Sequence, residues 1–313
     1  MKKLRRTMNN NLKQYATSMS IYLLILSMFS CSNDEQQQNY ESPVAGIDTI
    51  YVEDVLYPYF MDAKPTYDSV FEHAKITLIP LSARRGMSLF FSDTASCVIL
   101  ARDYLRDEDS IVKAMSLPFQ KIEIAKDGLV FFVARSIPFD TVNLTQLHDL
   151  FTGTSPNVIQ KNVKLDETIC IPSMQSSEYA GILQYFSKGM DAPPITFRHF
   201  EHRDSLKAHI RKSKSIGVGL MSDIVKDSTL KAIRIGYTDS TGRRIAPQIV
   251  HPGFIVQNMY PLILPIFAYV KSEKKDLVWG FATFMEKDPS IQKVLLNKGI
   301  VPSHAKYNLI QED

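Results

Sequence analysis

The amino-acid sequence predicts an α/β protein with mainly parallel sheets flanked by helices, and two patterns indicate this fold class. Short apolar runs, rich in Val, Ile, Leu and Phe, alternate along the chain with longer amphipathic stretches. From residue 49 onward the two kinds of segment follow one another in the order of βαβ units, which build parallel sheets. In such sheets ligands bind beyond the carboxyl ends of strands, where helix N-termini present free N–H groups. The loops after strands are therefore where a site is expected.

Each apolar run predicts a strand and each amphipathic stretch predicts a helix. The expected strands are residues 49–52, 76–81, 96–101, 129–134, 168–172, 215–220, 232–237 and 263–270. The expected helices are residues 57–74, 84–92, 107–115, 144–151, 177–188, 204–212, 277–287 and 290–296. The sequence shows no internal repeat.

Residues 1–30 have the features of a secretory signal. Basic residues and no acidic ones precede the apolar run 21–29, and Cys31 follows it almost at once. Crossing a bilayer takes about 20 apolar residues, so this shorter run suits the apolar region of a signal peptide. Residues 26–31, LSMFSC, resemble a bacterial lipobox, which implies that Cys31 becomes the diacylated first residue of the mature chain. The alternative is an N-terminal anchor helix with a chance cysteine.

Residues 31–46 are expected to be a flexible tether. They are rich in Gln, Asn and Ser and show no apolar periodicity, so they cannot bury enough surface to become ordered. Asn33, Asp34 and Glu35 resemble the acidic export signal of Bacteroidetes-type surface lipoproteins. We therefore expect a lipid-anchored protein of a Gram-negative cell envelope, either facing the periplasm or exposed on the outer membrane.

The net charge excludes a nucleic-acid partner. The chain has 36 basic and 33 acidic residues, but its first thirty residues contain five of the basic ones and none of the acidic ones. The mature chain therefore has 31 basic against 33 acidic residues, and the basic excess belongs to the signal. Such a balance gives no electrostatic footprint for nucleic acid.

Cys97 and Cys170 each lie inside an apolar run, SCVIL and TICIP. Export to an oxidising compartment permits a disulfide. Their placement in two separate predicted strands favours buried free thiols instead.

Five segments, in order, resemble phosphate-type solute-binding proteins (the PstS family), and the resemblance is to a divergent branch of Bacteroidetes lipoproteins. They are DGLVFFV at 127–133, LTQLHDLFTG at 144–153, SEYAGILQYF at 177–186, SIGVG at 215–219, and the stretch 284–302 that ends GIVP. The resemblance covers nearly all of 48–305.

This resemblance implies a two-lobed periplasmic binding protein fold of type II, with a hinge between the lobes. One lobe is expected from residues 47–124 together with 256–313, and the other from 125–255. The resemblance implies capture of a small anion, such as phosphate, between the lobes. It also implies delivery of that anion to a membrane partner, here an ABC transporter permease or another envelope complex.

The family's anion ligands come from four loops. Two of these loops match segments in the first part of this chain. The loop at 81–85 supplies Ser82, with Arg84 and Arg85 behind it, although Ser82 can also be no more than a helix cap. The loop ARD matches the family's acidic ligand with Asp103, and Arg102 stands where the family has serine. A carboxylate at Asp103 is expected to accept a hydrogen bond from a protonated phosphate oxygen and so to reject fully ionised sulfate.

The other two loops depart from the family pattern. The loop after the first strand, residues 53–57, has none of the family's small hydroxyl donors. In the fourth loop, Ser176 and Ser177 remain as donors at a helix N-terminus, but Glu178 replaces the family's threonine and Pro172 its arginine. We expect Glu178 to repel an anion and Arg84, Arg85 or Arg102 to supply the missing positive charge.

No other motif predicts chemistry. The cluster of His199, Glu201, His202 and His209 resembles metal ligands, but its charged neighbours favour a solvated turn. Because the sequence has no nucleophile elbow, P-loop or zincin motif, we expect no catalytic residue, no metal and no cofactor. The alternative to solute binding is an envelope scaffold lipoprotein that keeps the binding-protein fold without a small ligand, since fold alone does not decide function.

Overall fold

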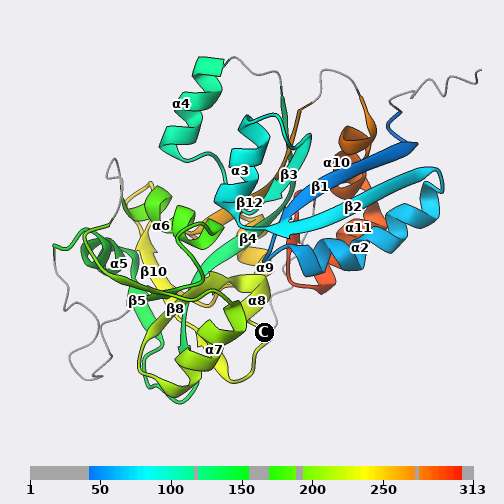
Figure 1. Ribbon diagram of the computed structural model, residues 1–313. Helices are drawn as coiled ribbons and strands as arrows, with labels where there is room; N and C mark the ends of the chain where they lie inside the picture. Colours follow the sequence, from blue (N-terminus) through cyan, green and yellow to red (C-terminus); the bar gives the residue numbers. More distant parts are fainter. Residues whose placement is uncertain (1–41, 116–118, 155–168, 188–192, 272–274, 305–313) are drawn as a thin grey trace, which may run out of the picture. The chain divides into compact units, whose positions relative to one another are not determined.

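The computed structural model describes residues 42–115, 119–154, 169–187, 193–271 and 275–304, and Figure 1 shows their arrangement. All of them belong to one unit of contacts, which runs from Glu41 to Asp313. Cys31, the signal and most of the tether lie outside the described residues.

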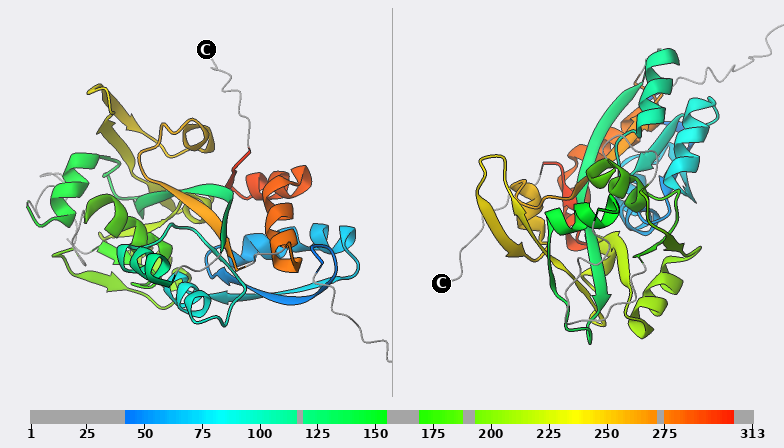
Figure 2. Two further views of the ribbon diagram at one scale, coloured as in Figure 1. Left: turned by 90° about the horizontal axis from the view of Figure 1, so that it is seen from above. Right: turned by 90° about the vertical axis from the view of Figure 1, so that its left-hand side faces the viewer.

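Ten strands of the described part form one sheet. Its main path is β2 (Ala74–Leu81), β1 (Gly46–Glu53), β3 (Cys97–Leu100), β12 (Ile263–Val270), β4 (Gln120–Ala134), β8 (Ile216–Leu220), β6 (Ile169–Ile171) and β7 (Phe197–His199). Beside this path, β4 also pairs with β9 (Leu230–Ala232) and β13 (Val301–Pro302). A smaller sheet, partly gold in Figure 2, holds β11 (Arg244–Gln248), β10 (Arg234–Thr238) and β5 (Thr141–Asn143).

Helices separate most of these strands. They are α2 (Tyr57–Val70), α3 (Ala83–Phe91), α4 (Arg106–Met115), α5 (Leu144–Phe151), α6 (Ser177–Phe186), α7 (Arg203–Lys212), α8 (Met221–Ile224), α9 (Pro252–Val256), α10 (Leu277–Lys287) and α11 (Pro289–Asn297). Several begin at a side-chain cap that satisfies free N–H groups: Asn143 for α5, Asp276 for α10 and Asp288 for α11. Within the described residues, no helix combines the length and apolar character needed to cross a membrane.

The strand β3 shows how the sheet is covered on both faces. Side chains alternate between the two faces of a strand. Cys97 and Ile99 belong to the main hydrophobic core. Val98 and Leu100 belong to a second cluster, beneath α3. A strand that is buried on both faces reads as a continuous apolar run, which is why CVIL was recognisable in the sequence.

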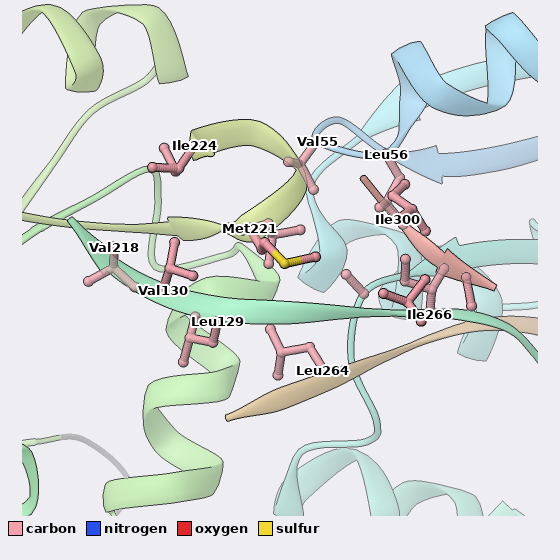
Figure 3. Packing of buried hydrophobic residues seen from close by; sticks show 14 of the residues in the cluster. Val55, Leu56, Leu129, Val130, Val218, Met221, Ile224, Leu264, Ile266 and Ile300 are labelled. Carbon is pink, nitrogen blue, oxygen red and sulfur yellow. The ribbon is translucent and has the colours of Figure 1, made fainter. Parts of the chain in front are cut away.

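The long strand β4 joins the two halves of the sheet. Its residues up to Gly128 pair with β12, and from Leu129 onward they pair with β8 and β9. Figure 3 shows Leu129 beside Leu264 of β12 at this change of partner. A Cβ on Gly128 would lie 2.9 Å from a methyl carbon of Val250 and 3.3 Å from the Tyr260 ring, so only glycine fits without a shift.

The structure confirms the α/β fold class and most expected elements, with corrections. The sheet is mixed rather than mainly parallel, because β4 and β12 run antiparallel to their neighbours. β4 begins at Gln120, before the apolar run expected at 129–134, because its first half is partly exposed and reads as polar. The run at 232–237 divides into β9 and β10, and α2 ends at Val70 instead of 74. The short elements β5, β7, β11, β13, α8 and α9 were not expected.

Candidate anion-binding site

The candidate site lies where two neighbouring strands end opposite a helix N-terminus. Strands β1 and β3 are parallel neighbours, so their carboxyl ends meet at one edge of the sheet. Glu53 is the last residue of β1, Ala101 follows β3, and Ser177 is the first residue of α6. The chain thus brings a carboxylate and two backbone N–H groups together from three distant segments.

The carboxylate of Glu53 accepts three hydrogen bonds in this place. The N–H of Ser177 donates to Oε1 at 2.9 Å, the Ser177 hydroxyl donates to Oε2 at 2.5 Å, and the N–H of Ala101 donates to Oε2 at 2.9 Å. Both Glu53 and Ser177 are fully buried. Free N–H groups at a helix N-terminus favour negative charge. These three donors therefore bind the Glu53 carboxylate in a place whose polarity suits an anion.

The electrostatic surroundings make the charge of Glu53 costly. The pKa of Glu53 is raised to about 7, chiefly by burial and secondly by the negative charge of Glu178. The hydrogen bonds from Ala101 and Ser177 and the charge of Arg203 act in the opposite direction. Burial and the neighbouring carboxylate therefore favour the protonated form of Glu53 compared with a glutamate in solvent.

Arg203, at the start of α7, is the cation of this cluster. It pairs with Glu178 through both terminal nitrogens, and Nη2 lies 3.1 Å from Asp54 Oδ1. The Glu178 side chain is fully buried, whereas that of Asp54 is about half exposed. Glu178 is thus neutralised by a salt bridge, and the carboxylate that meets the helix N-terminus donors is Glu53 instead.

Ser82 and Ser176 lie in the two loops that meet beside these donors. The hydroxyl of Ser82 donates to Oε1 of Gln175 at 2.9 Å, and the N–H of Arg84 donates to the carbonyl of Gln175 at 3.0 Å. Ser82 occupies the N-cap position of α3 without a side-chain cap bond. Ser176 caps α6 by accepting the N–H of Tyr179. The hydroxyl groups of both serines are therefore engaged with protein atoms.

The predicted arginines form a separate cluster around the start of α4. Arg102 is 2% exposed and holds Glu108 with both terminal nitrogens, at 2.5 and 2.8 Å. Arg84 pairs with Asp107 and with Glu108, the latter at 2.7 Å. Arg85 is exposed. The positive charges of Arg84 and Arg102 are thus balanced by acidic side chains.

The carboxylate of Asp103 contacts other groups than the donors that bind Glu53. Its carboxylate lies 2.8 Å from Nζ of Lys121 and accepts the N–H of Tyr104 at 2.8 Å. A longer contact of 3.4 Å joins it to the hydroxyl of Tyr269. The structure therefore groups Ser177 with Glu53, Ser82 with the Gln175 loop, and Asp103 with Lys121.

A pocket of about 770 Å³ adjoins the donors. Residues of α4, its preceding loop and α6 line it, among them Arg84, Arg102, Tyr104, Gln175, Ser176 and Tyr179. Arg102 follows Ala101 in the chain, and Ser176 precedes Ser177. The lining of the pocket thus includes the chain neighbours of both backbone donors.

Sequence reasoning missed Glu53 and Arg203. The loop at 53–57 lacks the family's hydroxyl donors. The acidic residue at its start, Glu53, ends a buried strand at an expected ligand position, and this pattern could have indicated its role. Arg203 carried no such signal, because it reads as one charge among several in FRHFEHRD. Its role depends on the tertiary packing of α7 against the α6 N-terminus.

Two other predictions concern cysteine and metal. Cys97 and Cys170 are free and buried, as expected. Over the described ranges, no group of three or more His, Cys, Asp or Glu side chains is placed to hold a metal ion. His202 instead takes the N-cap position of α7, and the ring of His209 lies 5.2 Å from that of Phe200.

Solved structures with this fold include solute-binding proteins and a regulatory domain. A substrate-binding protein assigned to phosphate ABC transport, with bound phosphate, from Clostridium perfringens is 13% identical, with a TM-score of 0.66 over 82% of this chain and 99% of that one. An ABC-type phosphate transport receptor from Vibrio cholerae is 17% identical, with a TM-score of 0.62 over 82% and 99%. The CcmR regulatory domain from Synechocystis, in complex with 2-PG, is 10% identical, with a TM-score of 0.52 over 77% and 95%.

At these identities the likeness shows the two-lobed fold, and the presence of a regulatory domain among the matches illustrates that the fold serves more than one function. No curated protein has a sequence that matches this chain. The sequence does match the profile of the PBP superfamily domain over residues 39–288. With most of its length covered by that profile, the chain belongs to the PBP superfamily domain family.

Proposed function

We propose that this protein is a lipid-anchored, extracytoplasmic solute-binding protein for phosphate or another small oxyanion, in uptake or sensing. The observation that supports this most directly is the convergence of three donors on one carboxylate. Two belong to Ser177 and the third is the N–H of Ala101. A carboxylate and an oxyanion require the same donors, so this arrangement suits either. The proposal includes no catalytic step.

We also propose how the chain divides into two lobes. We assign residues 47–124 with 256–313 to one lobe and 125–255 to the other, with the hinge in β4. The change of partner strands at Gly128 and Leu129 supports this division. The donors then come from both lobes, as capture of a solute by hinge closure requires.

We also propose a cellular location and a partner for this protein. Lipid on Cys31 and the polar tether behind it would hold the domain at the envelope of a Gram-negative bacterium. The partner would be an ABC transporter permease or another envelope complex. The relatives assigned to phosphate ABC transport support this direction through their fold and the bound phosphate of one of them.

A second candidate function is an envelope scaffold protein without a small ligand. The observation that favours it is the buried carboxylate of Glu53, which already holds the donors of the site. The contacts of Gln175 with Ser82 and Arg84 further join the two sides of the cleft without a solute. A protein closed on its own side chain can present a fixed surface to a partner.

Anion binding distinguishes the two functions. We expect phosphate or sulfate to raise the melting temperature of the wild type at about pH 6, below the pKa of Glu53, relative to chloride at equal ionic strength. Ser177→Ala removes one hydroxyl donor and should weaken binding roughly tenfold. Ser69→Ala, an exposed serine of α2, serves as the matched control. Wild-type protein that responds to no oxyanion would favour the scaffold function.

A further inference from the structure

We propose that Glu53 is a built-in competitor of the solute. Its carboxylate occupies the anion site and must leave, which loss of its charge favours, before an external oxyanion binds. This inference rests on the proposed function and adds the residue that sets affinity and specificity. It also explains why the loop after β1 has an acidic residue where hydroxyl donors were expected.

The hydrogen bonds exclude joint occupancy. The N–H groups of Ala101 and Ser177 each have one hydrogen, and both already lie 2.9 Å from a Glu53 oxygen. A solute can make these bonds only if Glu53 releases them. Because Glu53 is on β1 and Ser177 on α6, the same bonds hold the two sides of the cleft together, as a bound solute does in proteins that close on their ligand.

The charge distribution makes a second anion unfavourable while Glu53 is ionised. Three carboxylates lie around this place: Glu53 at the end of β1, Asp54 directly after it, paired with Arg203, and Glu178 from α6. The facing cation is Arg203 of α7. One guanidinium cannot balance three carboxylates and an incoming dianion. Protonation of Glu53 removes one negative charge, and its raised pKa of about 7 makes that form accessible near neutral pH.

The neighbouring pocket gives the exchange room. It reaches Arg102 and Ser176, which adjoin the two backbone donors in the chain. A solute in this pocket would reach the N-terminus of α6 once Glu53 withdraws and the cleft opens. The exchange therefore requires a change at one side chain together with partial opening of the cleft.

Calorimetric titration with phosphate and sulfate at about pH 8, one unit above the Glu53 pKa, tests the inference on four proteins. Glu53→Ser removes the carboxylate and should bind at least tenfold more tightly than the wild type. Glu53→Gln removes the charge but keeps the volume, so its affinity should fall between those two. Asp68→Asn is the matched control: it removes a partly exposed carboxylate of α2 that pairs with Lys64, and should stay within about threefold of the wild type.

A pH series on the wild type provides a test that does not depend on the folding of a variant. Sulfate remains a dianion from about pH 6 to pH 8, whereas the protonated fraction of Glu53 changes about tenfold across its pKa of about 7. If the protonated form admits the anion, the apparent sulfate affinity should be about tenfold higher at the lower pH. Glu53→Gln should lose most of this dependence, which separates Glu53 from every other titrating group.

The outcomes separate this inference from the proposed function. If all four proteins bind an oxyanion equally and without the pH dependence, Glu53 is no competitor, although the solute-binding function stands. If neither the wild type nor any Glu53 variant binds an oxyanion at either pH, the proposed function fails together with the inference. If only the Glu53 variants bind, Glu53 blocks the donors at both pH values, the natural protein is the scaffold, and the pH-dependent exchange is wrong.

Discussion

At the scale of single residues, the site shows which carboxylate meets the anion donors. From the sequence we expected Glu178 to repel an anion, because it stands in the first turn of the helix that follows the serine loop. The structure directs Glu178 to Arg203 and places Glu53 on the donors of Ser177 and Ala101. The sequence identified the helix N-terminus but not the side chain that reaches it from another strand.

The salt bridge between Glu178 and Arg203 should contribute to stability. Removing Glu178 breaks the charged hydrogen bonds of a buried pair but also relieves its repulsion of Glu53, so the net cost should be about 1.5–3 kcal/mol. We therefore expect Glu178→Gln to lower the free energy of unfolding in urea by roughly that amount, even though Arg203 keeps Asp54. Asp109→Asn, which breaks an exposed pair with Lys113, should cost less than about 1 kcal/mol. Equal effects of the two changes would contradict this role of Glu178.

At the scale of secondary-structure elements, the predicted bounds are most accurate where both faces of a strand are buried or where a helix begins at a side-chain cap. The apolar run of β12 was predicted to the residue. The helices α5 and α10, with caps at Asn143 and Asp276, were as well. The first half of β4 escaped prediction, since its burial depends on β12, which comes about 140 residues later. Long-range pairing of this kind has no local signal.

The long strand β4 contains a buried carboxyl group whose titration should affect stability. Oδ1 of Asp127 accepts the N–H groups of Gly128 and Ser222, and burial raises the pKa of this carboxyl to about 7. Because this value lies above that of the unfolded chain, the folded state binds the proton more tightly. The stability that protonation contributes is therefore complete at low pH and is lost as the pH rises through about 7.

Comparison of Asp127→Asn with the wild type isolates this group. The amide keeps an acceptor for the two N–H groups and has no charge to bury. We expect the difference in free energy of unfolding, variant minus wild type, to become more positive between about pH 5 and pH 8, by on the order of 1 kcal/mol or more. Glu53 titrates equally in both proteins. A difference that does not change with pH would show that Asp127 is not protonated in the folded protein.

At the scale of the whole molecule, the family and the two-lobed α/β fold were predictable from five weak motifs in a fixed order. The profile match confirms the family over 39–288. The motifs did not predict the mixed sheet or the placement of the Glu53 carboxylate on the donors of Ala101 and Ser177. Both depend on contacts between segments far apart in sequence, such as the 124 positions between Glu53 and Ser177.

The proposed lobes predict how the chain responds to division. A lobe that contains both the first and the last part of the chain cannot form from either part alone, and β12 pairs with both β3 and β4. A fragment of residues 126–313 should therefore be unfolded by circular dichroism and cleaved rapidly by protease. A protease-resistant fragment with native-like spectra would show that the lobe boundaries are wrong.

The occupant of the anion site can be observed directly. We would determine a crystal structure of the wild type grown at about pH 8 in chloride, without phosphate, sulfate or carboxylate buffers. We expect the Glu53 carboxylate to lie about 2.9 Å from the backbone nitrogens of Ala101 and Ser177. Glu53 turned away, with water or chloride on those two nitrogens, would contradict it.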